Sequence, residues 1–136
     1  EPVEVIRDLK INRPLGSHFD KAKFKRLESW RSERSLRNIV LNIQSLETFF
    51  MGSYTKDVGL RSLFSEHENN EIINNFRQVQ NDLKNIQMPL EQAIRTPMGY
   101  KAAEALASSL SELHKSLGKV INLNGIHLGF NSRDGD

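Results

Sequence analysis

Apolar residues recur at every third or fourth position in three long stretches of the chain, and this spacing predicts amphipathic helices. We expect the first helix from about Asp20 to Met51, the second over residues 68–87, and the third from Pro97 to about residues 122–125. Since one helix cannot cover its own apolar face, the three rows are expected to pack together. The rows are Leu36, Ile39, Val40, Ile43, Leu46, Phe49 and Phe50, then Ile72, Ile73, Phe76, Val79, Leu83 and Ile86, and finally Ala103, Leu106, Leu110, Leu113, Leu117 and Val120.

Glycine, proline and threonine mark the expected ends of these helices. Gly52 follows the first helix and is expected to stop it. Thr96 is expected to cap the third helix, because Pro97 then falls at its first position, where proline is favoured. Gly125 is expected to terminate that helix.

The remaining stretches show no sustained period. Residues 60–67 predict a short helical turn, and residues 89–96 a short segment that begins at a proline. Residues 1–19 are interrupted by proline and glycine, so we expect a lead-in loop there, and residues 126–136 are expected to be a tail. No stretch alternates with period two. The sequence therefore predicts an all-α fold, with a helical bundle over residues 20–125.

A second, polar row accompanies the apolar row of the first predicted helix. Arg31, Ser35, Asn38 and Asn42 recur at helical spacing and fall within a narrow arc beside the apolar one. Such a row is typical of a helix edge whose side chains reach water or cap a neighbouring loop. The alternative is that it faces a partner and contributes to a binding site.

Composition excludes several classes of protein. With 136 residues, 38% hydrophobic and 26% charged, the chain fits one folded domain. It has no cysteine, so disulfide and thiolate chemistry are excluded. A net charge of +2 is too small to indicate nucleic-acid binding. No apolar run is long enough for a membrane helix. Since the sequence begins without Met or a signal core, we expect it to be part of a longer protein.

The other residues that could bind a metal or take part in catalysis are better explained by structural roles. His67 and Glu71 stand four residues apart, a spacing that suits a shared metal, but Glu is common at helix starts. His114 lies beside an apolar row and is expected to be partly buried. No nucleophile elbow or phosphate loop occurs, so no catalytic residue is assigned. His18 and His127 lie in predicted loops, the basic run 21–26 is expected to be a solvated helix start, and Asp134, Gly135 and Asp136 lack the spacing of a calcium loop.

Four segments together resemble a known family. They are residues 27–54, "LESWRSERSLRNIVLNIQSLETFFMGSY", residues 59–64, "GLRSLF", residues 89–94, "PLEQAI", and the ending "LGFNSRDGD". This combination is similar to the C-terminal half of imelysin-like proteins, also called insulin-cleaving membrane proteases. The resemblance covers the chain from about residue 24 to the end.

The resemblance implies a two-domain, all-helical protein of which this chain is one half. Such proteins are exported to the periplasm or cell envelope, often as lipoproteins, and are associated with iron uptake or its regulation. Their site lies between the domains, and a Gly-x-His-x-x-Glu motif in the N-terminal half marks it. The nearest text here, residues 16–21, has Lys21 in place of the Glu, so the motif is not carried over.

The resemblance assigns the polar row a partner. The N-terminal half would be that partner, and iron or zinc would be held through its His and Glu. This chain alone is not expected to be an enzyme, although a metallopeptidase is the alternative that the family name implies. A helical interaction module without a site of its own is the third possibility. The residues expected to line the inter-domain face are Trp30, Arg31, Arg34, Ser35 and Asn38.

Overall fold

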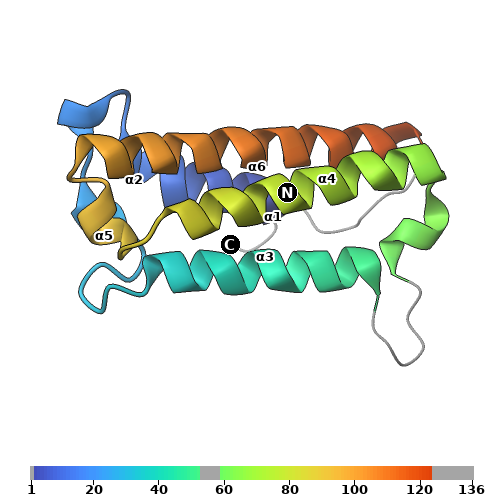
Figure 1. Ribbon diagram of the computed structural model, residues 1–136, viewed down its shortest axis with the longest axis horizontal. Coiled ribbons are helices and arrows are strands. Elements are labelled where there is room, and N and C mark those ends of the chain that lie inside the picture. The colour runs from blue at the N-terminus through green and yellow to red at the C-terminus, as the bar shows by residue number, and fades with distance from the viewer. Residues whose placement is uncertain (1, 53–58, 124–136) are drawn as a thin grey trace, which may run out of the picture.

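The computed structural model describes residues 2–52 and 59–123, and every regular element within these ranges is helical. The longest are α3 (Ser35–Met51), α4 (Glu66–Asn85) and α6 (Pro97–Leu123), which lie side by side in Figure 1. The short helix α5 (Leu90–Ala93) joins α4 to α6, and the 3-10 turn η4 (Leu60–Leu63) precedes α4. The all-α bundle predicted from the sequence is confirmed.

Helices α4 and α6 form an antiparallel pair with α5 at the turn between them (Figure 1). Their predicted apolar rows meet in the core. Ile72, Val79, Leu106 and Leu110 are each completely excluded from solvent. Burial of such side chains stabilises the fold by roughly 1.5–3 kcal/mol each. This pair is the part of the bundle that helical periodicity predicted best.

The N-terminal segment is helical, so the predicted lead-in loop over residues 1–19 is wrong for most of its length. Helix α1 (Pro2–Val5), the π-helical η1 (Ile6–Asn12) and α2 (Arg13–Leu15) follow one another without a break. Val3, Ile6, Ile11 and Leu15 are buried, with Ile11 fully excluded from solvent. Tertiary burial against α6 overrides the weak local signal, and the proline lies in the last short helix rather than ending it early.

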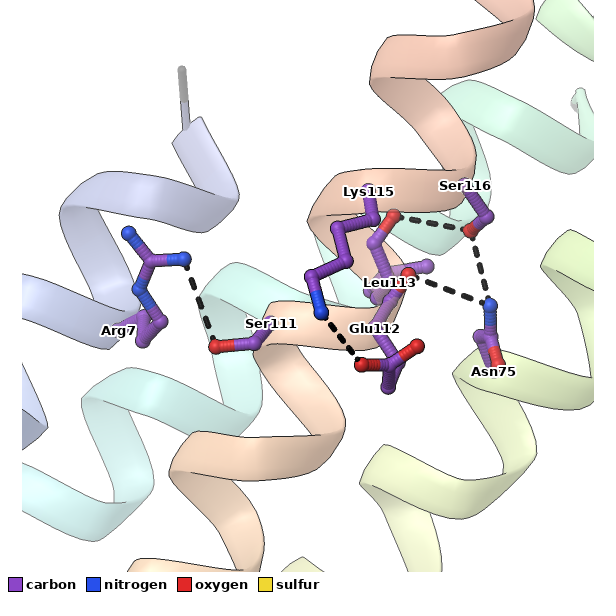
Figure 2. A network of polar contacts seen from close by, with 7 residues as sticks. All are labelled: Arg7, Asn75, Ser111, Glu112, Leu113, Lys115 and Ser116. Atoms are coloured by element: carbon purple, nitrogen blue, oxygen red, sulfur yellow. Dashed lines mark hydrogen bonds and ion pairs between the residues drawn. The ribbon is translucent and has the colours of Figure 1, made fainter.

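Polar contacts hold α6 from two sides (Figure 2). From η1, the Arg7 guanidinium donates to Ser111 Oγ at 3.4 Å. From α4, the Asn75 amide donates to Ser116 Oγ at 2.9 Å. Ser116 in turn donates to the Leu113 carbonyl at 3.0 Å. These contacts fix the position of α6 between its neighbours in addition to apolar packing.

Helix α3 begins fifteen residues later than predicted, so the expected helix start at Asp20 is wrong. Residues 16–34 form two 3-10 turns, η2 (Phe19–Lys21) and η3 (Phe24–Arg26), followed by further turns. Few residues of this segment are buried, Leu27 being the main one, so a continuous helix here would bury little apolar surface. As a result Arg31 precedes α3, and only Ser35, Asn38 and Asn42 of the polar row are helical.

Helix ends mostly follow the expected chemistry. Gly52 ends α3 with φ 86°, which glycine adopts easily. Thr96 caps α6, because its Oγ1 accepts from the Gly99 N–H at 3.1 Å. Helix α4 begins two residues before the prediction, since Ser65 and Glu68 form a capping box. Gly125 and the tail 126–136 lie outside the described residues.

Candidate functional site

The start of α3 and the short helix α5 bring two buried polar side chains together. Ser35, 3% exposed, opens α3, and Glu91, 1% exposed, lies in α5. The Ser35 hydroxyl donates to Glu91 Oε1, and the Ser35 N–H donates to the same oxygen at 3.3 Å. The carboxylate therefore caps the first turn of α3 from another helix, where the helix dipole favours a negative charge.

Two further residues extend this polar contact into a junction. The Ser29 N–H donates to Ser35 Oγ at 3.3 Å, and the Asn38 amide donates to Ser29 Oγ at 2.9 Å. We call Ser29, Ser35, Asn38 and Glu91 the polar junction. It joins the turn before α3, the helix itself and α5. Thus two of the five predicted site residues lie inside this chain's own hydrogen-bond network.

The second oxygen of the Glu91 carboxylate takes no part in the hydrogen bonds of the junction. Glu91 Oε2 is buried and has no hydrogen-bond partner among the described residues. Buried polar atoms are nearly always paired, and an unpaired one costs roughly 1–3 kcal/mol. This oxygen is therefore the point in the junction best suited to receive a donor or a cation.

Sequence reasoning missed Glu91, although it stands in the quoted segment "PLEQAI". Its neighbours Leu90, Ala93 and Ile94 are all buried, at 0–1% exposure. A carboxylate inside a short apolar segment opened by a proline was the available signal. Helical periodicity does not reveal the hydrogen-bond partner of Glu91, because Ser35 lies 56 positions away in the sequence.

The other predicted site residues lie at the surface beside the junction. Trp30 is partly buried and meets Phe24 edge to face, with ring centroids 5.9 Å apart. Arg31 is exposed, and its Cζ lies 5.0 Å from the Trp30 ring centroid. Arg34 is exposed and precedes α3, where its carbonyl accepts from the Asn38 N–H at 2.9 Å.

The backbone next to Arg34 adopts an uncommon conformation. Glu33 has φ 53°, the only positive φ of a non-glycine residue in the described ranges. Its carboxylate accepts from the Gln92 amide, with distances of 3.3 and 3.2 Å to its two oxygens. A second contact thus links the turn before α3 to α5. Strained backbone of this kind is held by its surroundings and is common near functional sites.

The histidines do not gather with carboxylates in the described part of the chain. Within residues 2–52 and 59–123, no three His, Cys, Asp or Glu side chains are placed to hold a metal ion. His18 contacts Ser17 Oγ at 2.9 Å, and His67 is exposed in the first turn of α4. His114 is partly buried, as expected. His127, Asp134, Gly135 and Asp136 lie outside the described residues.

A separate open groove of about 260 Å³ lies between α2 and α6. Asn12, Gly16, Tyr100 and Glu104 line it with small side chains of α6. Burial raises the pKa of the Tyr100 hydroxyl. The groove contains none of the predicted site residues.

A comparison with protein families identifies a family to which the chain is similar. The family model described as Imelysin (Peptidase M75) matches residues 1–117. This chain belongs to the imelysin family. The match confirms the family resemblance and covers three of the four segments on which it rests, while the ending at residues 128–136 lies outside the matched range. It also includes the N-terminal helix, which the resemblance did not cover. No curated protein and no solved structure matches the chain.

None of the helices in the described residues is both long and apolar enough to span a bilayer.

Proposed function

We propose that this chain is one half of a cell-envelope imelysin that binds a ligand or metal in iron uptake or its regulation. The site lies between two helical-bundle domains in this proposal. This half supplies Trp30, Arg31, Arg34, Ser35 and Asn38, and the N-terminal half supplies a His and a Glu. The proposal places the protein in the periplasm, anchored as a lipoprotein through the N-terminal half.

The observation that carries the proposal is the unpaired oxygen of Glu91 in the polar junction. Two of the segments on which the family resemblance rests fold together there, one carrying Ser35 and the other Glu91. Exposed Arg31 and Arg34 stand beside them. An arrangement of one free buried acceptor with two exposed arginines suits a ligand that has both cationic and anionic groups, such as a metal with its bound anion.

This half supplies only some of the ligands that iron or zinc would need. Glu91 Oε2 is an oxygen ligand of the kind that such ions accept, and a metal bound there would bring positive charge next to the buried carboxylate. The described residues offer no complete set of ligands. The N-terminal half must therefore supply the rest.

A metallopeptidase is the second candidate, and it is favoured by the description of the matching family. Hydrolysis needs a metal with an open coordination position and a base that activates water. In this candidate the polar junction orients a ligand or substrate carboxylate, and the N-terminal half holds the metal.

Arg31→Ala in the intact two-domain protein tests the proposal. We expect the substitution to weaken binding of iron or zinc, measured by isothermal titration calorimetry, by about tenfold, as for other residues around a metal site. Helicity should stay unchanged, because Arg31 is exposed and lies outside α3. Arg77→Ala, an exposed arginine on α4, is the matched control. Equal affinities of the two variants would count against the inter-domain site.

A further inference from the structure

Three cations gather on two aromatic rings at the end of the bundle where α5 lies and α6 begins. Arg95 Cζ lies 3.5 Å from the ring centroid of Phe24, which meets Trp30 edge to face. Two further cations lie over Trp30, Arg31 at 5.0 Å and Lys25 at 5.8 Å from its centroid. We call these five residues the cation–π cluster. They come from η3, from the turn before α3 and from the connection between α5 and α6.

The cations of this cluster form no ion pairs with carboxylates of the described residues. No ion pair within 4.0 Å joins Lys25, Arg31 or Arg95 to an acidic side chain in residues 2–52 and 59–123. Residues 21–37 contain seven basic and two acidic residues, against 19 and 17 in the whole chain. All seven basic side chains are exposed.

Both acidic residues of this segment are engaged elsewhere. Glu28 pairs with Lys10 of η1 at 3.0 Å, and Glu33 accepts from Gln92. With seven basic against two acidic residues, the segment keeps an excess of positive charge. Like charges held this close repel one another, so an anion that binds between them is favoured.

The aromatic rings hold the cations without using their hydrogen-bond donors. A cation over a ring gains about 0.5–1 kcal/mol at an exposed site. A guanidinium that faces a ring keeps its N–H groups in its own plane, where they can donate in pairs to a carboxylate or phosphate. The cluster thus combines cations that lie over aromatic rings with N–H donors for which the described residues supply no acceptor.

We propose that the cation–π cluster binds an oxyanion, a carboxylate or phosphate group, and that Lys25, Phe24 and Arg95 belong to the ligand site beside Arg31. The inference rests on the proposed function in one respect, because it gives the inter-domain ligand a negatively charged part. A free polycarboxylate or phosphate and a lipid headgroup share this chemistry.

Fluorescence of Trp30 tests the proposal, because it is the single tryptophan of the chain. The 136-residue chain is titrated with citrate, with inorganic phosphate and with vesicles of phosphatidylglycerol in phosphatidylcholine, at constant ionic strength. Sodium chloride and pure phosphatidylcholine vesicles are the blanks. We expect a saturable fluorescence change with at least one of the three anionic probes.

Variants locate the binding site. Arg95→Ala and Lys25→Ala should each weaken the fitted affinity roughly two- to fivefold, as expected for exposed charge pairs. Arg95→Lys should fall between Arg95→Ala and the unchanged chain, since it keeps the charge but loses the paired donors. Arg77→Ala and Lys84→Ala remove exposed cations of α4 and should leave the affinity unchanged. Circular dichroism checks that all variants remain helical.

The outcomes separate the possible sources of the anion. Saturation by citrate or phosphate supports a free oxyanion, and a response to the anionic vesicles alone supports a lipid headgroup. The proposal is overturned if no probe gives a saturable change, or if cluster and control variants weaken binding equally. Saturation here with no metal uptake by the intact protein would refute the proposed function alone. Metal uptake that depends on Arg31, without a Trp30 response, would refute this inference alone.

Discussion

Ser35 and Glu91 illustrate how one pair of side chains decides where a helix begins. The carboxylate accepts from the first N–H of α3 and from the Ser35 hydroxyl, so the chain gains a tertiary cap at that residue. From the sequence, Ser35 was predicted to line an inter-domain face and to point toward the N-terminal half. The structure shows its hydroxyl engaged within the chain, which helical spacing alone does not reveal.

Ser35→Ala should lower the free energy of unfolding by about 2 kcal/mol, because it removes a hydrogen bond to a buried carboxylate. Ser45→Ala is the matched control in the same helix, since Ser45 is exposed and donates only to the Leu41 carbonyl. That control should change stability by less than about 0.5 kcal/mol. Urea unfolding followed by circular dichroism measures both. Equal effects would show that the junction contributes nothing to stability.

Asp8 provides a pH-dependent contribution to stability. Hydrogen bonds from the Arg7 guanidinium, at 2.7 and 2.8 Å, hold the pKa of Asp8 below its ordinary value. A lowered pKa means that the native state favours the charged form. The contribution is therefore present above about pH 4, the ordinary range of Asp, and is lost as the pH falls through the lowered pKa.

Asp8→Asn should thus lower the melting temperature slightly at pH 7, and this difference should be smaller at about pH 3, below the ordinary range of Asp, because the contribution is lost as the pH falls toward the lowered pKa of Asp8. Thermal unfolding of both proteins at the two pH values measures the effect. The effect should be small, because the pair is partly exposed. A difference of the same size at both pH values would contradict the account.

At the scale of elements, periodicity predicted the helices that pack along their whole length. Helices α4 and α6 lie almost where expected, because each carries an unbroken apolar row that the other covers. In α3 the row includes Phe49, which is 59% exposed, while Phe50 packs against Phe76 at 5.8 Å. The N-terminal helix was missed because its few apolar residues show no clear helical spacing in the sequence. Their burial becomes evident only from their contacts with α6.

The turn from α5 into α6 depends on a glycine. A Cβ at Gly99 would lie 2.2 Å from the Ala93 carbonyl oxygen, which is backbone and cannot move freely. Gly99→Ala should therefore destabilise the protein by about 1–3 kcal/mol. Gly118→Ala in the same helix has open space around the new methyl group, so it should stabilise by up to about 1 kcal/mol. Effects of the same sign in denaturant unfolding would contradict the structure of this turn.

At the scale of the whole molecule, the predicted site residues gather at one end of the bundle with Glu91 and Arg95, which sequence reasoning did not select. Segments 24–38 and 91–95 meet there through the polar junction and the cation–π cluster. Their meeting depends on how α5 lies against the start of α3, a tertiary arrangement that no local pattern encodes. The sequence predicted the bundle and part of the polar junction and the cation–π cluster, namely Ser35, Asn38, Trp30 and Arg31. The contacts that join the segments required the structure.

The central claim is that this chain supplies one half of a two-part binding site. Intact mass and metal content of the native material that contains this chain test it most directly. The account predicts an N-terminal half, in the same or a co-purifying polypeptide, together with iron or zinc in a fixed ratio to protein. A native protein that consists of this chain alone and carries no metal would contradict it.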